Sequence, residues 1–178
     1  MVVWLIGMSG AGKTVIGQEV CRQLKKKYAH VVFFDGDVVR SIMGNDLGHS
    51  LEARLENAKR INRLCHYLDQ QGIHVICGIL SIFPESQVWN RTNIKDYFEV
   101  YIKTSLETLL KRDSKGLYRK VREGHISNIV GFDIPFPEPL HPDLVVENNG
   151  DKSIEHVAHD IVSELNSKNF SLGPCVEF

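Results

Sequence analysis

The sequence predicts an α/β fold, a three-layer αβα sandwich built on a parallel five-stranded sheet. Short, continuous apolar runs alternate along the chain with segments of helical periodicity. That alternation is typical of a parallel sheet covered by helices on both faces. The chain has 178 residues, of which 43% are hydrophobic and 24% charged, which suits a single domain with a substantial core. We therefore expect residues 1–178 to form one domain.

Five apolar runs are the expected strands, and each is short and bounded by polar residues or glycine. They are residues 2–6, 30–34, 73–80, 98–102 and 143–148. Four segments have apolar residues at helical spacing and are the expected helices. They are residues 13–27, 50–71, 106–112 and 151–167. Ser50 is the expected N-cap of the long second helix, and Gly72 is expected to end it.

The segment GMSGAGKT, residues 7–14, matches the pattern GxxxxGK[ST] and lies between an expected strand and an expected helix. Its glycines let backbone N–H groups turn inward around phosphate oxygens at the positive end of the helix dipole. Lys13 would reach the β- and γ-phosphates, and Thr14 would bind Mg²⁺. The expected nucleotide-binding residues are Gly7, Ser9, Gly10, Ala11, Gly12, Lys13 and Thr14. The sequence therefore predicts a P-loop NTPase-type fold.

Two carboxylates follow the second expected strand. The third strand lacks the terminal Asp of a usual Walker B site, so Asp35 and Asp37 are the best-placed acids. Ligands of parallel sheets bind at the carboxyl ends of the strands. Asp35 could hold Mg²⁺ or accept a proton from an attacking hydroxyl, and Asp37 could orient the acceptor. Arg40 could pair with an anionic acceptor group. The alternative is a capping Asp and a surface ion pair.

Residues 113–142 are polar and lack a core pattern, which is typical of a lid or binding loop. Residues 111–125 hold six Lys or Arg against two acids, a local charge of +4. A solvated charged loop is the commoner explanation of such a run. Beside a phosphate loop, however, a basic lid can close over a triphosphate and neutralise developing charge. Arg112 and Lys115 are the expected lid cations.

The composition bears on which partners the protein binds and in which cell compartment it works. The net charge of −1 gives no global basic field for nucleic acid or an anionic membrane. No apolar run approaches the roughly 18 residues that a membrane span needs, and the N-terminus lacks the basic region of a signal peptide. The four cysteines have no metal-binding spacing. We expect buried, reduced thiols in a cytoplasmic protein.

Six segments together resemble the adenylylsulfate kinase family over about residues 2–165. They are GMSGAGKT, DGDVVR, LGHSLEARLENAKRI, ILSIF, KRDSKGLYRKVREGHISNIVGFDIPFPEP and HPDLVVEN, in the order of the family. The resemblance implies a homodimeric, Mg²⁺-dependent enzyme that transfers the γ-phosphate of ATP to the ribose 3′-hydroxyl of adenosine 5′-phosphosulfate. It also implies a catalytic, metal-linked Asp35, with Arg40, Arg54 and Asn57 holding the acceptor nucleotide.

Ser81 matches a family serine that is often described as a phosphorylated intermediate. Direct in-line transfer needs no such intermediate. A hydroxyl that ties down a strand end is an equally good explanation of a serine at this place.

The departures from the family pattern gather at the acceptor. His49 and Ile129 replace two phenylalanines that typically sandwich the acceptor adenine, and Ile82 and Pro84 replace a proline and an arginine. Losing two stacking faces weakens base binding by about 1–3 kcal/mol per face. This pattern suggests a changed acceptor, as in the cytidine diphosphoramidate kinase branch, which serves bacterial capsule modification. Neutral drift in a true adenylylsulfate kinase is the alternative, because an imidazole can still stack on adenine.

A different class of function also fits a phosphate loop. The chain could be a non-catalytic, nucleotide-binding regulatory module. The intact Lys13, Thr14 and Asp35, together with the basic lid, favour the enzyme instead.

Overall fold

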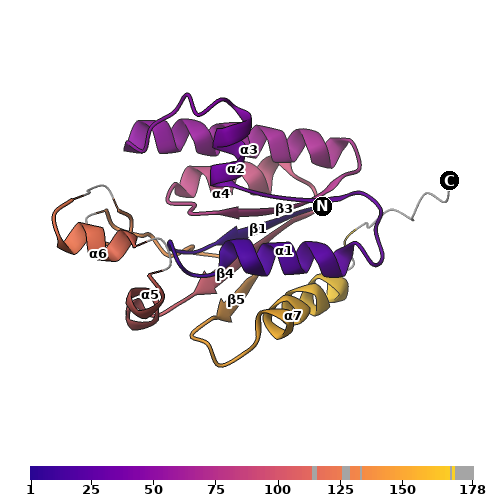
Figure 1. Ribbon diagram of the computed structural model, residues 1–178. Coiled ribbons are helices and arrows are strands. Elements are labelled where there is room, and N and C mark those ends of the chain that lie inside the picture. The colour runs from indigo at the N-terminus through magenta and orange to yellow at the C-terminus, as the bar shows by residue number, and fades with distance from the viewer. Residues whose placement is uncertain (114–115, 126–128, 133, 169, 171–178) are drawn as a thin grey trace.

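The computed structural model describes residues 1–113, 116–125, 129–132, 134–168 and 170. A five-stranded parallel sheet forms its centre, in the order β2-β3-β1-β4-β5 (Figure 1). The strands are β1 (Val2–Ile6), β2 (Val31–Asp35), β3 (His74–Ile79), β4 (Tyr97–Lys103) and β5 (Leu144–Glu147). All five predicted strands are confirmed, each within one residue at either end. This fold is of the P-loop NTPase type, as predicted.

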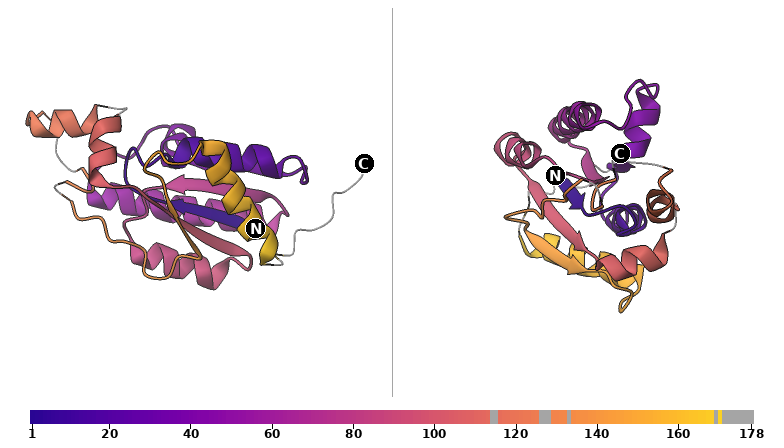
Figure 2. Two further views of the ribbon diagram at one scale, coloured as in Figure 1. Left: turned by 90° about the horizontal axis from the view of Figure 1, so that it is seen from below. Right: turned by 90° about the vertical axis from the view of Figure 1, so that its left-hand side faces the viewer.

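Helices cover both faces of the sheet and its carboxyl-terminal edge. Helices α1 (Lys13–Leu24) and α7 (Ile154–Ser167) lie on one face, and α2 (Gly36–Ile42), α3 (Leu51–Gln70) and α4 (Pro84–Asn93) lie on the other (Figure 1). Helices α5 (Leu106–Arg112) and α6 (Leu117–Arg122) project beyond the carboxyl ends of the strands (Figure 1, and the left view of Figure 2). The carboxyl edge therefore carries both the phosphate loop and the lid.

The core consists of two layers divided by the sheet. Along β1, Val3 and Leu5 point into the layer beneath α1 and α7. Val2, Trp4 and Ile6 point into the layer beneath α3 and α4. Every residue of β1 is fully buried, because successive side chains of this central strand enter opposite layers. The strand that leads into the phosphate loop is therefore held rigidly from both sides.

The sequence analysis did not predict three of the helices, namely α2, α4 and α6. Helix α4 buries only Ser86 and Asn90, so it has no apolar stripe to reveal its period. Helices α2 and α6 have seven and six residues, too few for a periodic signal. Helix α6 lies within residues 113–142, where the sequence has no core pattern that would predict a helix.

The predicted helix caps and thiols can be checked directly. The Ser50 side chain accepts a hydrogen bond from the Ala53 backbone N–H and caps α3, as predicted. Cys21, Cys65 and Cys77 are buried and free, while Cys175 lies outside the described residues.

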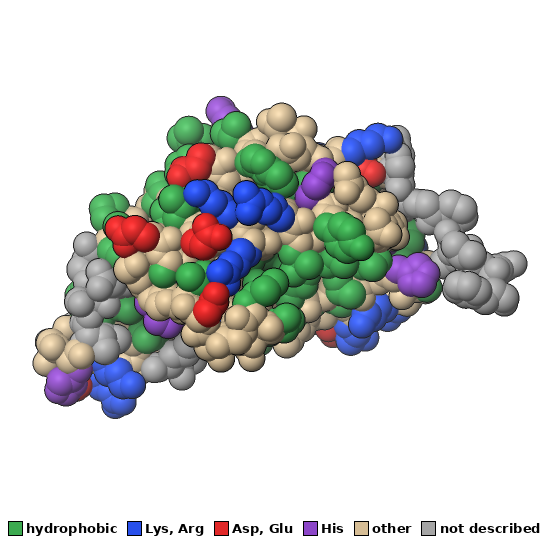
Figure 3. Space-filling view, turned by 90° about the horizontal axis from the view of Figure 1, so that it is seen from above, with side chains coloured by type: hydrophobic (Ala, Val, Ile, Leu, Met, Phe, Trp, Pro, Cys, Tyr) green, Lys and Arg blue, Asp and Glu red, His purple; other side chains and the backbone are tan. Residues whose placement is uncertain are grey.

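The face formed around α2 and α3 shows acidic and basic side chains next to one another, with hydrophobic patches beside them (Figure 3). Ile42 and Tyr67, on these two helices, are 68% and 59% exposed. Within the described residues, none of the helices has the length and apolar character that crossing a membrane requires. The single domain, the homodimer and the cytoplasmic location remain predictions.

Candidate active site

The phosphate loop connects β1 to α1 and requires glycine at several positions. Gly10 and Gly12 have φ angles of 82° and 95°, in the left-handed region that favours glycine. A Cβ on Gly12 would lie 2.7 Å from Nδ2 of Asn148, and one on Gly7 would lie 2.8 Å from the Ile102 carbonyl oxygen. The predicted glycine pattern is therefore a packing requirement as well as a conformational one.

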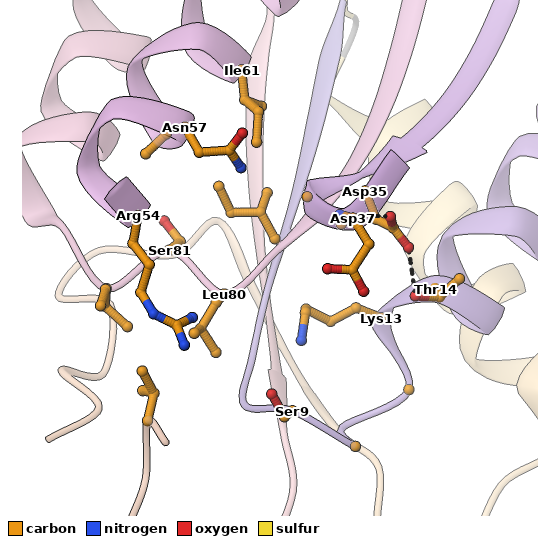
Figure 4. Close-up of a pocket in the computed structure, with 18 of the residues that line it drawn as sticks. Ser9, Lys13, Thr14, Asp35, Asp37, Arg54, Asn57, Ile61, Leu80 and Ser81 are labelled. Atoms are coloured by element: carbon orange, nitrogen blue, oxygen red, sulfur yellow. Dashed lines mark hydrogen bonds between the residues drawn. The ribbon is translucent and has the colours of Figure 1, made fainter. Parts of the chain in front are cut away.

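Lys13 is the first residue of α1, and its side chain extends over the loop into a cavity (Figure 4). Its Nζ donates hydrogen bonds to the carbonyl oxygens of Gly7 at 2.8 Å and Met8 at 2.9 Å. The carboxylate of Asp37 points toward the same space (Figure 4). This arrangement fixes an ammonium group at the mouth of the phosphate loop, where a terminal phosphate would carry the most negative charge.

Asp35 ends β2, and its two carboxylate oxygens have different roles. Oδ1 accepts hydrogen bonds from the backbone N–H groups of Asp37 and Val38 and so caps α2. Oδ2 accepts a hydrogen bond from the hydroxyl of Thr14 at 3.0 Å (Figure 4). The capping role that sequence reasoning offered as an alternative is real, and it coexists with a side chain directed at the phosphate loop.

The pair formed by Thr14 and Asp35 fits a magnesium ion. A hydroxyl and a carboxylate are hard oxygen ligands, and Mg²⁺ in kinases usually binds one or two protein carboxylates together with substrate phosphates and water. Groups of three or more His, Cys, Asp and Glu able to hold a metal are absent from the described part of the chain.

A cavity of about 1160 Å³ lies at the carboxyl edge of the sheet. Pockets for a single drug-sized ligand measure about 300–1,000 Å³, so this one has room for a donor and an acceptor. It brings together most of the predicted site residues. They are Ser9, Gly10, Gly12, Lys13, Thr14, Asp35, Asp37, Arg40, His49, Arg54, Asn57, Ser81, Arg112 and Ile129. Gly7 and Ala11 are buried residues of the loop itself and do not line the cavity, and Lys115 lies outside the described residues.

Arg40 and Arg54 both contact the loop between α2 and α3. Nη1 of Arg40 donates to the carbonyl oxygens of Leu47 and Gly48, at 3.2 and 2.8 Å. Nε of Arg54 donates to the carbonyl oxygen of His49 at 2.9 Å. The two guanidinium groups therefore also fix the backbone that places His49 at the cavity.

Asn57 is 5% exposed, and its Oδ1 has no hydrogen-bond partner. Its side chain reaches the cavity from α3, on the side opposite the phosphate loop (Figure 4). A buried amide oxygen without a partner carries a desolvation penalty that a bound donor would remove. Asn57 is therefore suited to bind an acceptor, as the resemblance implied.

Ile82 and Pro84 also differ from the family pattern, but only one of them reaches the cavity. Ile82 lines it, whereas Pro84 is the exposed first residue of α4 and is not part of the cavity wall. Proline is favoured at the first position of a helix, so Pro84 has a local structural reason to be there.

Ser81 follows β3 with a φ angle of 52° and is 4% exposed. Its Oγ accepts hydrogen bonds from Nε1 of Trp4 at 3.2 Å and Nε2 of Gln87 at 3.3 Å. These contacts support a hydroxyl that ties a strand end to β1 and α4.

Replacing Ser81 by alanine should therefore affect stability more than turnover. The change leaves the buried indole N–H of Trp4 without its acceptor, at a cost of about 1–3 kcal/mol of unfolding free energy. We expect kcat to remain within about threefold of the unaltered chain, measured beside thermal unfolding. Ser167→Ala, at the exposed end of α7, is the control. A loss of kcat beyond about a hundredfold would contradict this structural role.

Sequence reasoning missed two residues that touch the phosphate loop. Asn148 follows β5, is 3% exposed and lines the cavity. The rule that strand carboxyl ends form the site could have found it. Tyr118, on α6, is 2% exposed and donates a hydrogen bond from its hydroxyl to the Ser9 carbonyl oxygen at 2.8 Å. Burial, with a smaller effect of Asp113, raises the pKa of Tyr118, so its hydroxyl stays a donor. No periodic signal indicated this residue.

The sequence of the chain matches the family model of adenylylsulphate kinase over residues 1–147. The chain belongs to the adenylylsulphate kinase family. Two members of this family illustrate its range. The chain is 37% identical over 164 residues to the cytidine diphosphoramidate kinase of Campylobacter jejuni subsp. jejuni, covering 92% of this chain and 95% of that one. It is also 37% identical over 170 residues to the adenylyl-sulfate kinase of Halothermothrix orenii, covering 96% and 91%.

A solved structure of the family agrees with the fold. The Mycobacterium tuberculosis APS kinase, in complex with AMPPNP and APS, has a TM-score of 0.84 and 34% identity to this chain, covering 93% of this chain and 96% of that one. Family membership makes the chain a phosphotransferase of an ATP-using kinase family, and it disfavours the non-catalytic regulatory module. The equal identity to two kinases with different names leaves the acceptor undecided.

Proposed function

We propose that this family member transfers the γ-phosphate of ATP to the ribose 3′-hydroxyl of a nucleotide, and that the nucleotide is cytidine diphosphoramidate. The observation that carries the nucleotide-kinase part is the shared cavity. It places the phosphate-loop residues Lys13 and Thr14, the carboxylate of Asp35 and the buried amide of Asn57 around one space. A donor phosphate and an acceptor hydroxyl can therefore meet beside Asp35.

In the proposed reaction the acceptor hydroxyl oxygen forms a bond to the γ-phosphorus while the bond to the leaving ADP oxygen breaks. Asp35 accepts the proton of the hydroxyl. Lys13 stabilises the charge that develops on the transferring group, and Arg112 of the lid adds a second positive charge at the cavity. Mg²⁺ bound near Thr14 and Asp35 would neutralise phosphate charge.

Two departures from the family pattern favour cytidine diphosphoramidate over adenosine 5′-phosphosulfate. His49 and Ile129 both line the cavity, at the positions where the family typically stacks two phenylalanines on adenine. An aliphatic side chain at Ile129 provides no aromatic stacking face. A pyrimidine base has a smaller ring surface than adenine, so its binding depends less on aromatic stacking. Adenosine 5′-phosphosulfate is the second candidate, because most of the similar kinases carry the adenylyl-sulfate name.

A panel of nucleotides tests this proposal. ADP release is measured with ATP, Mg²⁺ and either cytidine diphosphoramidate, adenosine 5′-phosphosulfate or a 3′-deoxy analogue of each. We expect cytidine diphosphoramidate to give a kcat/KM at least about tenfold higher than adenosine 5′-phosphosulfate, which corresponds to the loss of about one stacking contact. The 3′-deoxy analogues should give no turnover. Efficient turnover of adenosine 5′-phosphosulfate would contradict the changed acceptor.

Restoring the two aromatic side chains tests the same proposal from the other direction. The double variant His49→Phe with Ile129→Phe should raise kcat/KM for adenosine 5′-phosphosulfate by about tenfold or more, because each face stacks on adenine. The control is His156→Phe with Ile42→Phe, which adds the same side chains at exposed positions outside the cavity. An unchanged preference in the first variant would show that these positions do not select the acceptor.

A further inference from the structure

The outward-facing carbonyl groups of the phosphate loop are held by side chains from three different elements. A peptide group is planar, with its C=O and N–H pointing in opposite directions. A loop that directs N–H groups at a phosphate must therefore direct the neighbouring carbonyls away from it, and each buried carbonyl needs a donor. Lys13 supplies donors to the carbonyls of Gly7 and Met8. Those of Ser9 and Ala11 have donors from outside the loop and α1.

Tyr118 holds the Ser9 carbonyl. Its hydroxyl donates to that oxygen at 2.8 Å, and its ring lies 4.0 Å from where a Cβ on Gly10 would be. The Asp113 carboxylate accepts the backbone N–H groups of Tyr118 and Arg119, at 3.1 and 3.0 Å, so the start of α6 is fixed relative to α5. Because the Ser9 carbonyl and the Gly10 N–H share one peptide plane, Tyr118 sets the direction of that N–H.

Asn148 holds the Ala11 carbonyl. Its Nδ2 donates to that oxygen at 2.8 Å, and this contact is buried. Its backbone N–H donates to the Lys103 carbonyl oxygen at 2.8 Å, which anchors it to β4. Its Oδ1 accepts a hydrogen bond from Nη2 of Arg112 at 3.5 Å. One amide side chain thus connects the peptide of Ala11 and Gly12 to a cation of the lid.

We propose that Tyr118 and Asn148 are positioning residues for the donor phosphates. They orient the backbone N–H groups of the loop that bind the phosphates and do not contact the phosphates themselves. Tyr118 orients the Gly10 N–H, and Asn148 orients the Gly12 N–H. Since Tyr118 lies on α6 and Asn148 contacts Arg112, the shape of the phosphate loop depends on the position of the lid. This inference rests on the proposed use of ATP but not on the identity of the acceptor.

Calorimetric titration of Tyr118→Phe with ADP and with AMP, each with Mg²⁺ and without acceptor, tests the inference. Phenylalanine keeps the packed ring and removes only the hydroxyl. We expect the Kd for ADP to rise about tenfold, which corresponds to the free energy of about one hydrogen bond. The Kd for AMP should change less than about threefold. The ratio of the two affinities separates positioning from a structural role, because general destabilisation would leave that ratio unchanged.

Two matched pairs complete the test. Tyr101→Phe removes another buried tyrosine hydroxyl, one that bonds to Glu138 instead of the phosphate loop, and should leave both affinities unchanged. Asn148→Ala should weaken ADP binding as Tyr118→Phe does, whereas Asn149→Ala, at the exposed neighbour, should not. Unchanged ADP affinity in Tyr118→Phe, or equal weakening in Tyr101→Phe, would overturn the inference alone. Failure of the unaltered chain to bind ADP would overturn the proposed function itself.

Discussion

Lys13→Ala is expected to abolish phosphoryl transfer, lowering kcat by at least about 1,000-fold. The Lys13 ammonium is held at the mouth of the phosphate loop by two carbonyl oxygens. There it can follow the charge that moves onto the γ-phosphoryl group and the leaving oxygen. Removing a single preorganised donor of this kind costs about 10²–10³ in kcat, and a full positive charge adds to that loss. The measurement is steady-state ADP release at saturating ATP and acceptor.

Lys25→Ala is the matched control, because Lys25 is an exposed lysine at the opposite end of the same helix. It should keep its full rate and the same thermal midpoint. If Lys13→Ala kept more than about a tenth of the kcat, Lys13 would not stabilise the transition state, and the phosphate loop would serve binding alone.

Asp35 should be equally indispensable, but two substitutions separate its two roles. Asp35→Asn keeps an oxygen that can accept the N–H groups of Asp37 and Val38, so α2 keeps its cap. It removes the negative charge that faces Thr14. We expect kcat to fall by at least about 1,000-fold, since both the proton acceptor and the metal-binding charge are lost.

Asp35→Ala should lose the same activity and, in addition, about 0.5–2 kcal/mol of unfolding free energy through the missing cap. Chemical denaturation of both variants beside the activity assay separates the two effects. Asp160→Asn serves as the control, because Asp160 lies on α7 and its carboxylate forms an ion pair with Lys152. An Asp35→Asn enzyme with nearly full activity would remove Asp35 from the mechanism and leave it as a helix cap only.

The parts of this fold that the sequence predicts are those with a repeating physical signal. The strands are continuous apolar runs because the sheet is buried on both faces. The phosphate loop can be recognised in the sequence because its backbone conformation requires glycine. Helix α4 was missed because its buried residues, Ser86 and Asn90, are polar. A helix without an apolar stripe cannot be distinguished from a loop by periodicity.

The candidate site residues with a local signal in the sequence were named in advance. Lys13, Thr14 and Asp35 were predicted from position alone, and the cavity brings them together. Tyr118 was not predictable, because its role depends on a contact with a residue 109 positions away in the chain. The end of β5 could have placed Asn148 at the site, but not its hydrogen bond to a carbonyl 137 positions away. Only the folded chain shows which carbonyl each one holds.

The acceptor is the point on which the account depends, and one competition experiment tests it directly. The chain is given ATP, Mg²⁺ and equal concentrations of cytidine diphosphoramidate and adenosine 5′-phosphosulfate, and both products are quantified by mass spectrometry, with the phosphate position assigned by ³¹P–¹H NMR. The account predicts at least about tenfold more phosphorylated cytidine nucleotide, with the new phosphate on the ribose 3′-oxygen. An excess of phosphorylated adenosine 5′-phosphosulfate, or phosphate at another oxygen, would contradict it.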